Sequence, residues 1–179
     1  SVASRGLGDV YKRQELEVED RECHNGGAQI VEDALGNLVY CKHDGSLNNG
    51  FEIVTHPMTL AYVHQLDWSF TEKLIQTGHR SWDTDTCGIH IHVDRRAFTG
   101  KKHMYAFSLL LMRNRALSYV IAGRNNNHYA KFDEENRKQI PQTLKRGRTM
   151  DRYTAVNCNP YSTIEVRMFR GSLKPERIM

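Results

Sequence analysis

The segment 87–93, Cys-Gly-Ile-His-Ile-His-Val, most strongly constrains what this chain can fold into. β-Branched residues stand at every second position, which predicts a strand with a buried apolar face. Residues two apart in a strand point to the same side, so His90 and His92 lie side by side on the other face. Two neighbouring imidazoles are candidate metal ligands or hydrogen-bond donors that contact phosphate. The alternative is a pair of hydrogen-bonded histidines on a half-exposed sheet, and the rest of the chain must decide between the two.

Carboxylates occupy alternate positions of a predicted strand near the start of the chain. Repulsion between three like charges on one face favours a face that holds cations, although a solvated edge strand would give the same pattern. Further along, Glu52 is the only charge in the predicted strand 51–55. If buried it needs a cation or several donors, and the alternative is an exposed strand residue. The three carboxylates of the first strand are Glu15, Glu17 and Glu19.

The last predicted strand covers residues 163–170 and carries a charge pair. Its apolar residues alternate with Glu165 and Arg167, which share one face and form either a structural salt bridge or part of a site. Helices are predicted over 28–35, 60–78 and 101–122, without a regular strand–helix alternation. This arrangement predicts an α+β domain with a mainly antiparallel sheet.

Composition excludes several classes of protein. A chain of 179 residues suits one domain, and its net charge of +4 is too weak to indicate a nucleic-acid partner. No apolar run approaches the roughly 20 residues that span a bilayer, so no membrane partner is expected. The four cysteines are scattered, which is typical of reduced thiols in a cytoplasmic protein.

Both ends of the chain have unusual sequences. Residues 9–14, Asp-Val-Tyr-Lys-Arg-Gln, resemble the translated end of a transposon used to build sequencing libraries. We therefore expect residues 1–14 to be an adapter-derived segment without fold information, and 15–179 to be the native domain. Because a helix is about to begin after Pro175, the chain is interpreted as a metagenomic fragment truncated at both ends.

Five segments, in this order and spacing, resemble the amidoligase family of the glutamine-synthetase-like carboxylate–amine ligases. They are Glu-Leu-Glu at 15–17, Lys-His-Asp-Gly-Ser at 42–46, Gly-Phe-Glu-Ile at 50–53, Gly-Ile-His-Ile-His at 88–92 and Thr-Ile-Glu-Val-Arg-Met-Phe-Arg-Gly at 163–171. The resemblance implies a curved, mainly antiparallel sheet covered by helices. It implies an ATP-dependent enzyme that forms amide bonds through an acyl phosphate, with Mg²⁺ or Mn²⁺ as cofactor and small-molecule or peptide carboxylates and amines as substrates. The oligomeric state, and the activity of a truncated chain, stay open.

The resemblance also implies roles for individual residues. His92 contacts the nucleotide phosphate, Arg167 grips the carboxylate substrate or the phosphate, and Arg170 is a weaker match for phosphate contact. Lys42, Asp44 and Arg152 lie in family-like segments without an assigned role. The implied metal ligands are Glu15, Glu17, Glu52, His90 and Glu165.

Two other functions fit part of the pattern. A metal-dependent hydrolase also uses a His-x-His strand, but the barrel hydrolases with this motif need a long strand–helix repeat and further histidines that are not found here. A non-catalytic domain of the same fold would bind a ligand without turnover. A requirement for ATP with Mg²⁺ separates the ligase from the hydrolase, and loss of turnover on Glu-to-Gln changes separates it from the binding domain.

Overall fold

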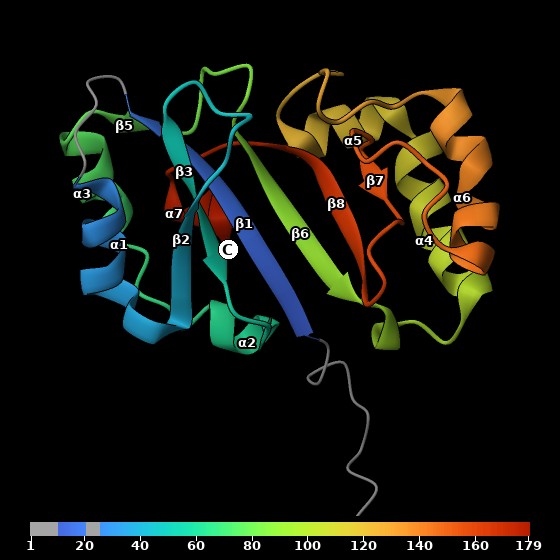
Figure 1. Cartoon of the computed structure of the whole chain (residues 1–179), viewed down its shortest axis with the longest axis horizontal. Helices are drawn as coiled ribbons and strands as arrows, with labels where there is room; N and C mark the ends of the chain where they lie inside the picture. Colours follow the sequence, from blue (N-terminus) through green and yellow to red (C-terminus); the bar gives the residue numbers. More distant parts are fainter. Residues whose placement is uncertain (1–10, 21–25) are drawn as a thin grey trace, which may run out of the picture. The chain divides into compact units, whose positions relative to one another are not determined.

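The computed structural model describes residues 11–20 and 26–179, which form two compact units (Figure 1). Of the described residues, the acidic unit comprises 13–20, 26–89 and 170–179. The histidine unit comprises 11–12 and 90–169. The boundaries fall inside three strands, β1 (Tyr11–Asp20), β6 (Gly88–Asp94) and β8 (Thr163–Arg170), so each of these strands contributes residues to both units.

The acidic unit is built on the strand order β2-β3-β1, with β2 at Val39–His43 and β3 at Gly50–Thr55. Both pairings are antiparallel. Helix α1 (Gly27–Leu35) packs against β2 and β3, because Val31 and Leu35 recur at helical spacing on its buried face. The remaining elements of this unit are the 3₁₀ turn η2 (Gly36–Leu38), β4 (Met58–Thr59), α2 (Leu60–Val63), α3 (Phe70–Gln76), β5 (His79–Arg80) and α7 (Pro175–Ile178).

The helix predicted over 60–78 is wrong in one respect, because the structure divides it into α2 and α3. Side chains in the intervening turn bond to the backbone in place of a continuing helix. Asp67 accepts the N–H of Ser69 at 2.9 Å, and the indole N–H of Trp68 donates to the carbonyl of Val63 at 3.3 Å. These bonds end α2 and direct the chain into α3.

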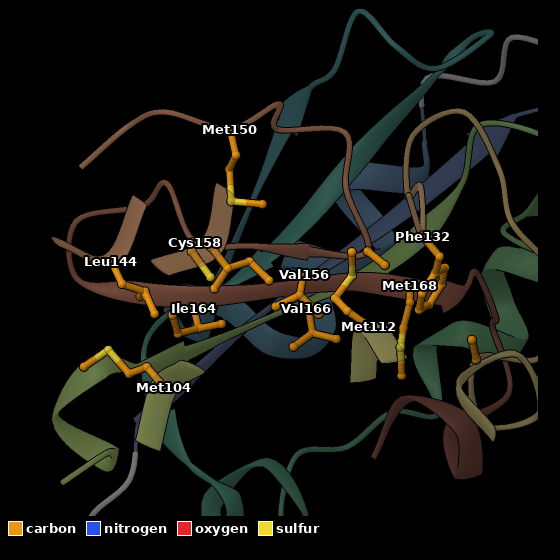
Figure 2. Close-up of a cluster of buried hydrophobic side chains, with 13 residues drawn as sticks. Met104, Met112, Phe132, Leu144, Met150, Val156, Cys158, Ile164, Val166 and Met168 are labelled. Atoms are coloured by element: carbon orange, nitrogen blue, oxygen red, sulfur yellow. The ribbon is translucent and has the colours of Figure 1, made fainter. Parts of the chain in front are cut away.

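The histidine unit has the strand order β6-β8-β7, with β8 at Thr163–Arg170 and β7 at Val156–Asn157. The predicted alternation of β8 is confirmed: Ile164, Val166 and Met168 enter the apolar core in Figure 2. Residues from the helices complete this core. The helical elements are the 3₁₀ turn η3 (Arg95–Ala97), α4 (Lys101–Arg113), α5 (Arg115–Ala122) and α6 (Glu134–Arg146).

The structure of this unit differs from the sequence pattern in three places. The predicted helix over 101–122 is broken at Asn114, whose side-chain amide donates to the carbonyl of Leu110 at 2.6 Å. Helix α6 lies in a charged part of the chain for which the sequence predicts no helix. The sequence pattern of residues 152–157 predicts a strand, but only β7 forms, because the N–H of Ala155 bonds to the carbonyl of Lys131 at 2.9 Å.

The predicted α+β class is confirmed, with antiparallel strand pairs and helices in both units. Strand β1 begins at Tyr11, so the structure includes residues 11–14 of the expected adapter segment, while residues 1–10 lie outside the described part. Gln14 is buried there and donates to the carbonyl of Ile178 at 2.6 Å. The adapter origin of these residues stays a prediction. Among the described residues, no helix is both long enough and apolar enough to span a membrane.

Candidate functional site

The three alternate carboxylates of β1 are buried. Glu15, Glu17 and Glu19 are 6%, 3% and 2% exposed, which excludes the solvated edge strand as an explanation of their pattern. Ionised carboxylates at this depth are stable only with cations or several hydrogen-bond donors around them. The groups around each carboxylate of β1 therefore indicate how its charge is compensated.

Backbone and hydroxyl donors hold two of these carboxylates. The N–H of Gly88, the first residue of β6, donates to Oε2 of Glu17 at 2.6 Å. Glu19 accepts the N–H of Asn48 at 3.2 Å and the hydroxyl of Thr86. These bonds connect β1 to the segment that leads into the histidine strand.

A row of charges crosses the three antiparallel strands of the acidic unit. Glu17 of β1 stands opposite Glu52 of β3, and Glu52 stands opposite Lys42 of β2. Nζ of Lys42 lies 2.8 Å from Oε2 of Glu52, so a residue without an assigned role proves to be the cation beside this buried carboxylate. A carboxylate oxygen of Glu15 also lies within 4.8 Å of one of Glu52.

The surroundings of Glu52 oppose its ionisation. Glu52 is only 2% exposed, and burial, followed by the hydrogen bond and charge of Glu15, raises its pKa to about 8. Lys42 acts in the opposite direction, and its own pKa is raised by Glu52 although burial lowers it. Arg13 forms an ion pair with Glu15, so each of these two carboxylates has a cation beside it, and burial still outweighs the effect of Lys42 on the pKa of Glu52.

In the histidine unit, Glu165 is the centre of a second buried cluster. Its Oε1 lies 2.6 Å from Nη1 of Arg167, 3.8 Å from Nδ1 of His90 and 3.7 Å from Nε2 of His92. The predicted Glu165–Arg167 pair is thus an ion pair, and both predicted histidines of β6 approach the same oxygen. The second nitrogen of His92, Nδ1, lies 3.1 Å from the hydroxyl of Thr163.

Asn157 belongs to this cluster, and the sequence did not indicate it. Its side-chain amide donates to Oε2 of Glu165 at 2.7 Å, while its Oδ1 accepts the N–H of Asn159 at 2.9 Å. The β7–β8 register places Asn157 directly opposite Glu165. With Arg167 on one oxygen and Asn157 on the other, the carboxylate is fixed in one orientation.

The other candidate residues have different surroundings. Arg170 is exposed, and the alternation of β8 gives it the parity of the core residues rather than that of Glu165 and Arg167. Asp44 accepts the N–H and the hydroxyl of Ser46 at 2.8 Å each, as the predicted turn requires. Arg152 donates to the hydroxyl of Tyr153 at 2.7 Å.

The two clusters provide groups that suit hard divalent cations. Buried carboxylate oxygens on strands are ligands that Mg²⁺ and Mn²⁺ prefer, and an imidazole among them is compatible with Mn²⁺. Arginine beside a carboxylate can bind a further anion, because its planar fork has five donors. The carboxylates of the acidic unit are therefore candidate ligands for such a cation, and the histidine unit places a carboxylate, two imidazoles and a guanidinium around one oxygen.

Comparison with family models finds a match over residues 19–179, which is most of the chain. The matching family defines a class of enzyme, an amide-forming ligase. The chain belongs to this family, whose description is "Putative amidoligase enzyme". The match covers Glu52, His90 and Glu165 and begins after Glu15 and Glu17. No curated protein matches the sequence.

Proposed function

We propose that the protein is an ATP- and Mg²⁺-dependent carboxylate–amine ligase that forms an amide bond through an acyl phosphate. One observation carries the proposal: a chain of the amidoligase family buries carboxylates and imidazoles on its strands, at the positions that resemble the metal- and phosphate-binding motifs of such ligases. Buried ionisable groups in this number are expensive for stability, and they are typical of functional sites.

The proposed reaction has two transfers. A carboxylate oxygen of the first substrate attacks the γ-phosphorus of ATP, the bond to the bridging oxygen breaks, and ADP leaves. The amine nitrogen of the second substrate then attacks the carbonyl carbon of the acyl phosphate. Inorganic phosphate leaves, and the nitrogen releases a proton to solvent. Both steps develop negative charge on oxygens, so catalysis depends on positioned cationic donors.

Arginine and histidine side chains are assigned to these charges. Arg167 is held at Glu165 by a 2.6 Å ion pair, so its guanidinium is oriented before an anionic substrate arrives. We assign it to the carboxylate substrate or the transferred phosphate, and His92 to the nucleotide phosphate. Arg170, which is exposed at the end of β8, is the weaker candidate for a phosphate contact.

The residues fit a divalent cation by their donor chemistry. We assign Glu15, Glu17, Glu52, His90 and Glu165 to metal binding, and each of these side chains is buried on a strand. When bound, Mg²⁺ or Mn²⁺ would neutralise the phosphate charge. Asn157 then has a positioning role, because it fixes the second oxygen of Glu165. The substrates would be small-molecule or peptide carboxylates and amines, in a cytoplasmic protein without a nucleic-acid partner.

Calorimetric titration of ATP, with and without Mg²⁺, tests the proposal on the wild type and on His90→Ala. A matched control is His64→Ala, because this histidine is exposed and belongs to no part of the proposed site. We expect binding that requires Mg²⁺, a loss of about tenfold or more in affinity for His90→Ala, as is usual when a group at a metal site is removed, and no change for His64→Ala.

The result that contradicts the proposal is equally specific. A folded wild type that binds Zn²⁺ tightly and ATP not at all would be a metal-dependent hydrolase. If ATP binds but Glu52→Gln and Glu165→Gln do not reduce ADP release with any carboxylate–amine pair, the protein is a binding domain of the same fold.

A further inference from the structure

Three aromatic rings of the histidine unit form a compact group, called the aromatic cluster below. It consists of His128, Tyr129 and Tyr153, whose ring centroids lie 5.3 to 5.9 Å apart. The guanidinium of Arg152 lies over the ring of Tyr153, 4.8 Å from its centroid. The rings come from two segments distant in the sequence, one after α5 and one before β7, and the proposed reaction uses none of them.

The backbone around the aromatic cluster is held in place. The N–H of Lys131 donates to the carbonyl of Tyr153 at 3.1 Å, and the N–H of Tyr129 donates to Oδ1 of Asn127 at 2.9 Å. His128 is exposed, and Tyr129 and Tyr153 are half-buried, so each ring keeps some accessible surface. An aromatic surface that is fixed before binding loses little conformational entropy when a ligand packs on it.

Arg167 connects the aromatic cluster to the proposed reaction. Its Nη1 pairs with Glu165 at 2.6 Å, while its Nε donates to the carbonyl of Tyr129 at 3.4 Å. An anion held by this guanidinium would therefore lie near the backbone of Tyr129, the residue that carries one ring of the cluster. In the proposed reaction that anion is the reacting carboxylate or the phosphate transferred to it. The base of ATP is separated from its γ-phosphate by the ribose and two further phosphates, so the rings are better placed for the acid than for the base.

The charges near the rings favour the acid substrate over the amine. Arg152 lies over the ring of Tyr153, whereas Arg167 donates to the backbone carbonyl of Tyr129. Lys131 and Arg167 are each paired with a carboxylate, Asp151 at 3.5 Å and Glu165 at 2.6 Å. The guanidinium of Arg152 is therefore the charge on the rings themselves, and it repels a protonated amine. A carboxylate with a planar or aromatic group is attracted by the charges and can stack on the rings.

We propose that the aromatic cluster is a specificity subsite for the carboxylate substrate and selects acids that carry an aromatic or other planar group near the carboxylate. The inference rests on the proposed function, because it assigns the anion at Arg167 to the acid substrate. It adds a substrate class, which the family match does not provide.

The test measures binding of two carboxylate probes, N-acetyl-phenylalanine and N-acetyl-alanine, by saturation-transfer NMR titration. The proteins are the wild type, His128→Ala, Tyr153→Ala and the control Tyr161→Ala, which removes a tyrosine that is 98% exposed in the same unit. We expect the wild type and Tyr161→Ala to prefer the aromatic probe by about fivefold, the range of one aromatic contact, and the two cluster variants to lose the preference. His128→Ala keeps the test valid if Tyr153→Ala does not fold, since His128 is exposed.

Equal affinity of the wild type for both probes, or an unchanged preference in both cluster variants, overturns the inference. A parallel MgATP titration identifies the other source of a planar anionic ligand. If the cluster variants lose affinity for MgATP and keep the probe preference, the rings bind the base of the nucleotide and the inference is wrong. If the wild type binds no ATP but shows the preference that the variants lose, the carboxylate subsite stands and the ligase proposal fails.

Discussion

At the scale of a single residue, Glu52 is the clearest case in which the proposed function opposes stability. A carboxylate 2% exposed on a central strand, opposite Glu17 and within reach of Glu15, destabilises the strands that carry it when it ionises. A glutamine of similar shape would remove this penalty. Under the proposed function, the glutamate serves a cation that needs its charge, which is the pattern expected where function overrides folding.

The raised pKa of Glu52 makes a prediction about the metal-free protein. Because its pKa is about 8 when folded and near 4.5 when unfolded, the stabilising preference for the protonated form is complete below pH 4.5 and is lost as the pH rises to 8. Glu52→Gln cannot ionise and does not lose this stability. The difference in free energy of unfolding, Glu52→Gln minus wild type, should therefore increase between pH 5 and pH 8, by on the order of 2 kcal/mol. Urea unfolding in EDTA measures the free energy of unfolding of both proteins at each pH. If the two pH profiles are parallel, Glu52 is ionised when buried and the prediction is wrong.

At the scale of elements, the row of charges formed by Glu17, Glu52 and Lys42 depends on how closely β3 approaches β1. Gly50 stands opposite Glu19 at the start of β3. A Cβ at Gly50 would meet the backbone of Val18 and Glu19, with the carbonyl oxygen of Val18 nearest. Backbone atoms cannot rotate away as a side chain can, so only glycine permits this approach.

We therefore expect Gly50→Ala to destabilise the protein by about 1–3 kcal/mol, the usual range for overpacking. The control is Gly45→Ala in the neighbouring turn, where a Cβ meets nothing within 4 Å and the change should stay within about 0.5 kcal/mol. Both variants are compared with the wild type by urea unfolding at one pH. Equal stability of the two variants would mean that β1 and β3 can shift apart without a loss of stability.

For the whole molecule, alternation along strands was the most informative pattern in the sequence. It predicted the paired histidines of β6 and the Glu165–Arg167 pair of β8, both of which the structure brings together around one oxygen. What it could not predict are partners across strands. Asn157 and Lys42 become visible only when β7 is aligned with β8 and β2 with β3, because register is a property of the folded sheet.

Helix α6 was missed for a different reason. Its sequence is dominated by charges, and Pro141 lies inside it. It is stabilised by its cap and by a few buried residues: Asp133 accepts the N–H of Asn136 at 2.7 Å, and Ile140 and Leu144 enter the core. A narrow apolar stripe in a charged segment gives a weak periodic signal, and tertiary packing decides the outcome.

Because β1, β6 and β8 each contribute residues to both units, we expect the two units to unfold together. Each unit contains a buried thiol that reports on it, Cys87 in the acidic unit and Cys158 in the histidine unit. Burial raises the pKa of Cys87 to about 12 and also raises that of Cys158. At pH 8 both are then almost entirely uncharged and resist alkylation while folded, and both react once unfolding returns them to a pKa near 9.

Pulsed iodoacetamide labelling along a urea series, read peptide by peptide with mass spectrometry, should give one midpoint for both thiols. Separate midpoints would show that one unit stays folded after the other unit, with its part of the shared strands, has unfolded.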